Sequence, residues 1–261
     1  MTVKSEDRHI RGVRVEIHGE PTDSPPLLFV HGGCQGSWSW EKVAPRLADD
    51  GWYAVCLNWY GRNGSSALGD GEALTRSLLD VTTEIAVVAE TLHRAPILVA
   101  HSMGSVPSLA YATTNPVPAL VLLAPVLPAG FGADPIELPV DPTSMWTPPP
   151  DLIKPTWWAG VTDDESRRYT SLLVPESPRA VLEATRWLCD VNTSDVHAPT
   201  LVIAADADAL IPAQVRVLAK ALGATFVLLE GEGHGIIVNP VWRDVAIRIS
   251  EWLSQLEGLA G

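Results

Sequence analysis

Ser102 stands between an apolar run, residues 96–100, and a stretch compatible with a helix, residues 105–113. Ala100 precedes it by two residues and Gly104 follows it by two, giving the pattern small-x-Ser-x-Gly. This pattern is typical of a nucleophile elbow, a turn so sharp that larger residues at those positions would make strand and helix collide. Such a turn holds the hydroxyl at the amino end of the helix, where developing negative charge is favoured. A serine that only caps a helix produces a similar local pattern.

A serine hydroxyl becomes a good nucleophile only when a base takes its proton, and the base needs an acid to orient it. Two apolar runs downstream lead into residues of these types. Residues 200–204 are followed by Asp206 and Asp208, and residues 225–229 lead to His234. The sequence therefore supplies a nucleophile, an acid and a base in the order Ser, Asp, His, with Asp206 and Asp208 as alternatives for the acid.

These side chains can meet only if the strands that carry them lie in one sheet. Short apolar runs, each of which predicts a strand, occur at 27–30, 52–57, 96–100, 119–123, 200–204 and 225–229, after a partly alternating edge strand at 10–18. Helical stretches separate them, most clearly at 74–94, where apolar residues recur every three or four positions. The alternation predicts an α/β fold with a mostly parallel, doubly wound sheet. Sites in such sheets collect at the carboxyl ends of the strands.

Residues 127–197 interrupt this alternation. They contain three consecutive prolines at 148–150, four of the ten tryptophans of the chain, and an amphipathic stretch at 178–188. A loop of this length without structure is uncommon in a folded domain. The segment is therefore predicted to be a helical cap inserted into a core made of residues 1–126 and 198–261. A second independent domain is the alternative.

The composition limits the partners of the protein. The chain carries 18 Lys and Arg against 31 Asp and Glu, a net charge of −13, which disfavours nucleic acid and anionic membranes. A polar amino-terminal stretch and the lack of a long apolar run predict a cytoplasmic protein without a membrane span. The three widely spaced cysteines predict reduced thiols rather than disulfides or a zinc site. No metal or nucleotide motif is present, so no cofactor is expected, and the oligomeric state stays open.

Residues 31–40 read HGGCQGSWSW. This segment resembles the HG-x-C-x-G-x-W-x-W opening of plant methylesterases, hydroxynitrile lyases and their bacterial esterase relatives. Together with the elbow and the Asp and His segments, it makes residues 10–257 resemble the α/β-hydrolase superfamily. The resemblance implies the α/β-hydrolase fold with a cap after the sixth strand.

The same resemblance assigns roles to individual residues. It implies Ser102 as the nucleophile and His234 as the base and then the acid in catalysis. It favours Asp208 over Asp206 as the residue that orients His234. The backbone N–H groups of Gly33 and Met103 would form the oxyanion hole.

The residues at three positions favour ester hydrolysis among the reactions of this superfamily. Dehalogenases and epoxide hydrolases carry aspartate at the position of Ser102. The related lyases carry threonine and lysine at the positions of Gly32 and Gly235. The sequence therefore predicts a serine esterase that forms an acyl-enzyme intermediate.

A small-molecule ester or lactone with an apolar or aromatic group is the expected substrate. The residues expected to line its pocket are Cys34, Trp146, Trp158 and Trp187, because tryptophans suit such groups. The tryptophans could instead only pack the cap onto the core. A lyase, a carbon–carbon bond hydrolase and a slow-turnover ligand receptor on the same fold remain alternatives.

Overall fold

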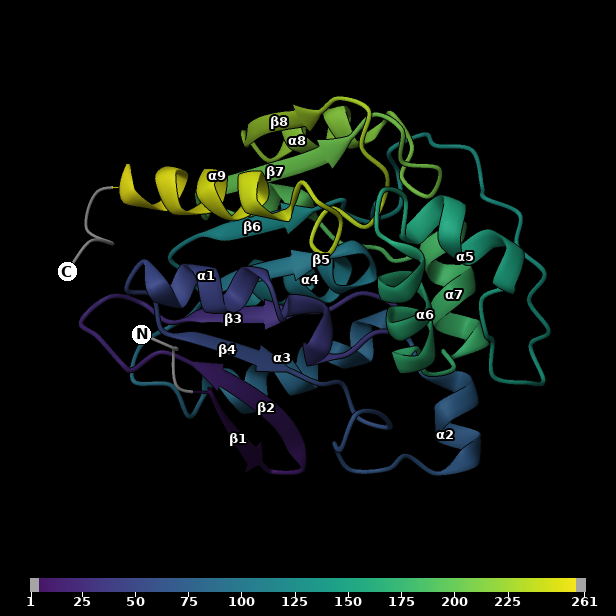
Figure 1. The fold of residues 1–261 in the computed structure, drawn as a ribbon, viewed down its shortest axis with the longest axis horizontal. Helices are drawn as coiled ribbons and strands as arrows, with labels where there is room; N and C mark the ends of the chain where they lie inside the picture. The colour runs from purple at the N-terminus through teal and green to yellow at the C-terminus, as the bar shows by residue number, and fades with distance from the viewer. Residues whose placement is uncertain (1–4, 257–261) are drawn as a thin grey trace.

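A single eight-stranded sheet runs through the computed structural model, which describes residues 5–256 (Figure 1). Its strands are β1 (Ser5–Ile10), β2 (Val13–His18), β3 (Leu27–Val30), β4 (Ala54–Leu57), β5 (Ile97–His101), β6 (Leu120–Leu123), β7 (Thr200–Ala205) and β8 (Thr225–Leu229). Their order across the sheet is β1-β2-β4-β3-β5-β6-β7-β8. The six strands β3 to β8 are parallel to one another. Strand β2 pairs antiparallel with both β1 and β4.

The register of the strands brings their carboxyl ends to one edge of the sheet. Val30 at the end of β3 pairs with Ala100 of β5, so the loop after β3 lies beside the turn after β5. On the other side, Ala205 at the end of β7 pairs with Leu229 at the end of β8. The three segments that carry the predicted chemistry therefore leave the sheet at the same edge.

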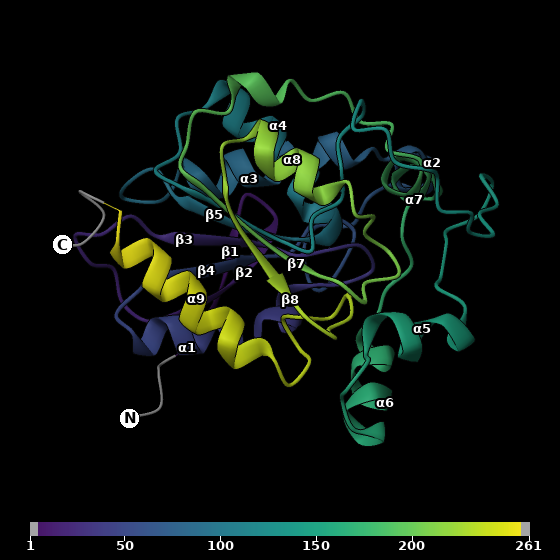
Figure 2. The ribbon, with the colours of Figure 1, turned by 90° about the horizontal axis from the view of Figure 1, so that it is seen from above.

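Helices cover both faces of the sheet. The α-helices are α1 (Val43–Asp49), α2 (Asp70–Thr75), α3 (Thr82–Ala89), α4 (Ser105–Thr114), α5 (Pro150–Trp157), α6 (Asp163–Leu172), α7 (Pro178–Thr185), α8 (Val215–Ala221) and α9 (Trp242–Ser254). Figure 2 shows α1 and α9 on one face and α3, α4 and α8 on the other. This arrangement confirms the predicted α/β fold with a mostly parallel sheet.

Burial explains why these segments form these elements. All four residues of β3 are fully buried, as expected for a parallel strand covered by helices on both faces. In α9 the buried residues Val245, Ala246, Ile249 and Leu253 form one stripe at helical spacing that faces the core.

Two predicted elements are divided in the structure. The prediction of a single edge strand at 10–18 is wrong, because Arg11 and Gly12 adopt positive φ angles and turn the chain into a hairpin between β1 and β2. The prediction of a single helix at 74–94 is also wrong. The chain is extended at Arg76 and Ser77, and a 3-10 turn, Leu78–Val81, leads into α3.

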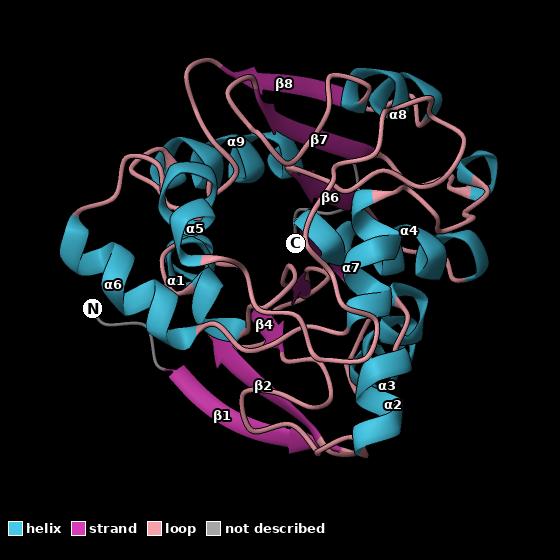
Figure 3. Cartoon of the chain, turned by 90° about the vertical axis from the view of Figure 1, so that its right-hand side faces the viewer, coloured by secondary structure: helices cyan, strands magenta, loops and turns pink. Residues whose placement is uncertain are grey.

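The segment between β6 and β7 contains α5, α6 and α7, which lie at the carboxyl edge of the sheet (Figure 1). Figure 3 shows α5 and α6 on one side of this edge and α7 with α2 on the other. The predicted boundaries of the cap, 127 and 197, fall in the loops that leave β6 and enter β7. The ends of the predicted core, residues 1–4 and 257–261, lie outside the described residues. No helix within residues 5–256 is long and apolar enough to cross a membrane.

Candidate active site

The turn that carries Ser102 has the geometry of a nucleophile elbow. Strand β5 ends at His101, and Ser102 has a φ of 52°, a left-handed conformation that residues other than glycine rarely adopt. A 3-10 turn, Ser102–Gly104, then leads directly into α4. A side chain at Gly104 would place its Cβ 2.4 Å from the carbonyl oxygen of His31, so only glycine allows this close approach.

A chain of hydrogen bonds connects Ser102, His234 and Asp208. Ser102 Oγ lies 2.9 Å from His234 Nε2, and His234 Nδ1 lies 2.8 Å from Asp208 Oδ2. Because an aspartate carboxylate only accepts hydrogen bonds, Nδ1 carries the proton and Nε2 is free to accept one from the serine. The side chains of His234 and Asp208 are both almost completely buried. The structure therefore brings together the three residues predicted for the triad.

Of the two candidate acids, Asp208 is the one that contacts the histidine. Its other oxygen, Oδ1, accepts hydrogen bonds from the N–H groups of Leu210 at 2.8 Å and Ile211 at 3.2 Å, which set the orientation of the carboxylate. Asp206 instead accepts a hydrogen bond from the N–H of Gly231 and holds the loops after β7 and β8 together. Asp206 thus has the role of a turn residue.

The predicted oxyanion donors, Gly33 and Met103, also lie at this site. Both line the cavity next to Ser102, and the Met103 side chain packs so closely on Gly33 that a Cβ there would lie 2.1 Å from its sulfur. Within residues 5–256, neither N–H group donates a hydrogen bond to the protein. Both donors are therefore left for a ligand.

Two buried histidines support the site through their ring nitrogens. His31 Nδ1 lies 2.8 Å from the carbonyl oxygen of Gly32, and its Nε2 accepts the N–H of Trp59. His101 Nε2 lies 3.1 Å from the carbonyl oxygen of His234. Burial, with the neighbouring His234, lowers the pKa of His101 to about 3, so His101 acts as a neutral donor.

A cavity of about 310 Å³ opens above the serine. Gly33, Ser102, Met103 and His234 line it together with apolar side chains, which include Val126, Ile136, Leu138, Ile153 and Val181. Among the described residues that line it there is no lysine or arginine, and the only carboxylate is that of the exposed Glu137. The cavity therefore favours an uncharged, apolar ligand.

Two of the four residues expected to line the pocket do so. Cys34 and Trp146 line the cavity, and burial raises the pKa of the Cys34 thiol well above its usual value. Trp158 and Trp187 do not line it, which corrects the prediction. Trp158 is fully buried against Trp38 and Tyr169.

Trp187, the other corrected residue, is buried beneath the first loop of the cap. Its Nε1 donates to the carbonyl oxygen of Asp134 at 3.0 Å. Its ring therefore packs the cap instead of contacting a ligand.

Comparison with known proteins identifies the family. The sequence profile of the alpha/beta hydrolase family matches residues 27–245. The chain belongs to this family. The hydrolase has no significant match among curated protein sequences.

Solved structures share the fold of this hydrolase at low sequence identity. An enol-lactonase from Burkholderia xenovorans LB400 is 17% identical with a TM-score of 0.72, covering 96% of this chain and 100% of that chain. A monoacylglycerol lipase from Paleococcus ferrophilus is 19% identical with a TM-score of 0.70, over 97% and 98% of the two chains. An epoxide hydrolase from Vigna radiata is 14% identical with a TM-score of 0.66, over 97% and 98%. These similarities show the fold alone.

Sequence reasoning missed one aromatic residue of the hydrolase's cavity, Trp157. It lines the wall together with Leu152 and Ile153 of the same helix, α5. The pair Trp157 and Trp158 marked this position in the sequence. Only the packing of α5 decides which ring faces the cavity.

Within residues 5–256, no group of three or more His, Cys, Asp and Glu side chains is arranged to hold a metal ion.

Proposed function

We propose that this hydrolase cleaves small, uncharged carboxylic esters or lactones with an apolar or aromatic group, with Ser102 as the nucleophile. The observation that carries the proposal is the continuous hydrogen-bonded chain from Ser102 through His234 to Asp208, which begins at an apolar cavity. This arrangement matches the requirements of nucleophilic acyl transfer.

In the first half of the reaction, Ser102 Oγ adds to the carbonyl carbon of the ester and its proton moves to His234 Nε2. Asp208 stabilises the imidazolium that forms, and the N–H groups of Gly33 and Met103 donate to the negatively charged oxygen. The bond to the leaving oxygen then breaks, and His234 gives its proton to that oxygen. The products of this half are an alcohol and an acyl-enzyme.

In the second half, water adds to the acyl carbon while His234 Nε2 takes one of its protons. The bond to Ser102 Oγ breaks, the serine regains the proton from His234, and the carboxylic acid leaves. With a lactone, the alcohol released in the first half stays attached to the acyl group.

The surroundings of the triad support hydrolysis over the lyase alternative. A side chain at Gly235 would place its Cβ 2.0 Å from the carbonyl oxygen of Trp157, so the lysine of the related lyases has no room there. A Cβ at Gly32 would lie 3.0 Å from that of Ser102. Within the branch of plant methylesterases and hydroxynitrile lyases that residues 31–40 resemble, we therefore assign this chain to the esterases.

A time course with excess p-nitrophenyl butyrate on the wild type and Ser102→Ala tests the proposal. Steady release of p-nitrophenol by the wild type, and none above background by the variant, is the expected result. A burst that stalls after one equivalent would indicate a receptor or a different acyl group. Steady turnover by the Ser102→Ala variant would refute the role of the serine.

A further inference from the structure

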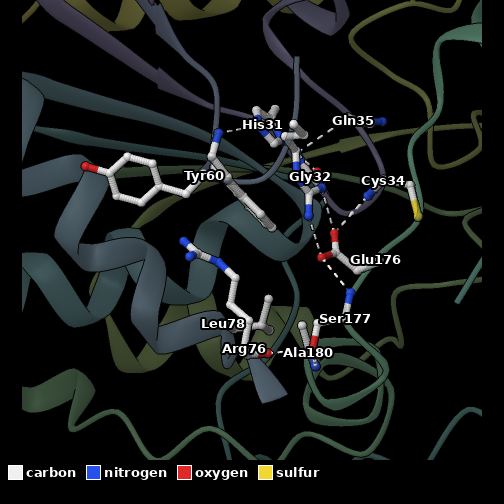
Figure 4. A network of polar contacts seen from close by, with 12 residues as sticks. His31, Gly32, Cys34, Gln35, Tyr60, Arg76, Leu78, Glu176, Ser177 and Ala180 are labelled. Atoms are coloured by element: carbon white, nitrogen blue, oxygen red, sulfur yellow. Dashed lines mark hydrogen bonds and ion pairs between the residues drawn. The ribbon is translucent and has the colours of Figure 1, made fainter. Parts of the chain in front are cut away.

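A short segment of the cap, residues 174–176, lies against the loop that follows β3. The Val174 N–H donates to the carbonyl oxygen of Cys34 at 3.0 Å. The Cys34 N–H donates to Glu176 Oε2 at 2.9 Å, as Figure 4 shows. Glu176 is itself fixed by two backbone hydrogen bonds of 2.8 Å with Trp146. Both backbone polar groups of Cys34 are therefore bound by the cap.

The Glu176 carboxylate is buried and fully hydrogen-bonded. Arg62 Nη1 donates to Oε2 at 2.9 Å and Nη2 donates to Oε1 at 2.6 Å, with only 4% and 1% of the two side chains exposed. The Ser177 N–H donates to Oε1 at 3.0 Å. Burial alone would raise the pKa of Glu176, but Arg62 and the backbone donors hold it below its usual value. Four donors thus satisfy a charged carboxylate, which offers about four acceptor positions.

Arg62 connects this carboxylate to the other end of the same loop. Its guanidinium lies 4.9 Å from the ring centroid of Trp59, and the Trp59 ring stacks on His31 at 4.6 Å. His31 Nδ1 in turn bonds the carbonyl oxygen of Gly32. The loop is therefore held at Gly32 by His31 and at Cys34 by Glu176.

These two contacts bind consecutive peptide groups on either side of Gly33. The first peptide has the Gly32 carbonyl and the Gly33 N–H on opposite edges of one plane, so holding the carbonyl aims the N–H. The second peptide contributes the Cys34 N–H that Glu176 accepts. Glycine at 33 restricts its own backbone little, and Cys34 has a φ of 59°, an uncommon conformation for a residue with a side chain. Outside contacts must therefore hold this conformation.

We propose that Glu176, paired with Arg62, is a positioning residue that sets the direction of the Gly33 N–H toward the oxyanion. The inference rests on the proposed function, because it assigns a task to the same site. A buried ion pair is by itself weak support for stability, since apolar residues of similar size often replace one without loss. The hydrogen bond to Cys34 is the feature that an apolar pair cannot replace.

Two variants separate positioning from stability. Arg62→Met/Glu176→Leu replaces the pair with apolar side chains and removes the acceptor for Cys34. Glu176→Asp keeps the charge opposite Arg62 but shortens the side chain by one methylene. Arg168→Met is the matched control, because Arg168 forms another ion pair between cap and core, with Glu41, away from this loop.

We measure kcat and KM for p-nitrophenyl butyrate, the rate of Ser102 labelling by an alkyl fluorophosphonate, and the thermal midpoint. In the labelling reaction the Ser102 oxygen displaces fluoride from phosphorus, and the oxyanion donors bind the phosphoryl oxygen. We expect kcat and the labelling rate to fall together by roughly 10- to 100-fold in the double variant, and less in Glu176→Asp. KM should change less than about threefold, and Arg168→Met should behave like the wild type.

Several outcomes overturn the proposal. The first is a kcat and a labelling rate near those of the wild type in whichever of the two variants folds. The second is a rise in KM without a fall in kcat. The third is a fall in kcat and labelling rate in Arg168→Met as large as that in the double variant. A wild type that is labelled but does not turn over esters refutes the proposed substrate class, and the labelling rates then decide the positioning role. A wild type that is not labelled refutes both.

Discussion

Replacing Asp208 by asparagine tests the orientation of the catalytic histidine with almost no change in shape. In the wild type, Oδ1 accepts the N–H groups of Leu210 and Ile211 while Oδ2 accepts His234 Nδ1. In the variant, the amide oxygen must stay where those two N–H groups donate. The NH₂ group then faces Nδ1.

An NH₂ group at that position can only donate, so it turns Nδ1 into an acceptor and moves the ring proton to Nε2. A protonated Nε2 cannot take the proton of Ser102. The equivalent change in a serine protease triad lowers kcat about 10⁴-fold, or about 5.5 kcal/mol of transition-state stabilisation. We expect a loss of this size in Asp208→Asn, with KM changed little.

Asp206→Asn is the matched control, two residues away in the same loop. Its amide oxygen can still accept the Gly231 N–H, and the side chain is exposed, so kcat should stay within about twofold of the wild type. Both variants are assayed with p-nitrophenyl butyrate after their thermal midpoints are compared. A loss below tenfold in Asp208→Asn, or a larger loss in Asp206→Asn, would refute the assignment.

Three further predictions concern the cavity wall, the packing at Gly235 and the buried ion pair. Trp157→Ala should raise the preference for p-nitrophenyl octanoate over butyrate by roughly tenfold, because it enlarges the cavity. Trp158→Ala should leave that preference unchanged and destabilise the fold by about 3–5 kcal/mol. The same change in preference in both variants would contradict the placement of Trp157 in the cavity wall and of Trp158 outside it. Gly235→Ala should destabilise by about 1–3 kcal/mol, because its Cβ would lie 2.0 Å from the Trp157 carbonyl oxygen, and an unchanged thermal midpoint would oppose this packing. The pKa of Glu176 lies below its usual 4.5, so its stabilising contribution is present above about pH 4.5 and is lost as the pH falls through the folded-state pKa. Between pH 6 and pH 3 the thermal midpoint should therefore fall less in Arg62→Met/Glu176→Leu than in the wild type. An equal fall in both proteins would count against a lowered pKa of Glu176.

Buried strands could be predicted from the sequence, because their residues are apolar. β3 is an uninterrupted apolar run, and so is β7 after its first residue, Thr200, because helices cover both faces of the sheet. β1 was not predicted, since Ser5–Ile10 is an exposed edge strand without an apolar pattern. The division of the 74–94 helix was missed for a related reason. Arg76 leaves the helical path where it forms an ion pair with the buried Glu84, a contact that apolar spacing does not reveal.

Some residues of the candidate site could likewise be predicted from the sequence, and others could not. The amino-acid sequence was enough to predict the elbow at Ser102, the choice of His234 and a carboxylate after β7, because sharp turns and strand ends restrict the residues next to them in the chain. The resemblance favoured Asp208 over Asp206, and the folded structure shows that Asp208 is the one in contact with His234. The choice between Trp157 and Trp158 came from the folded structure only, since neighbours in sequence differ in where packing points them. The folded structure also decided the contact between Arg62 and Glu176, which are 114 residues apart. Such a pair leaves no local pattern, because its stability comes from the burial and donors that the folded chain assembles around it.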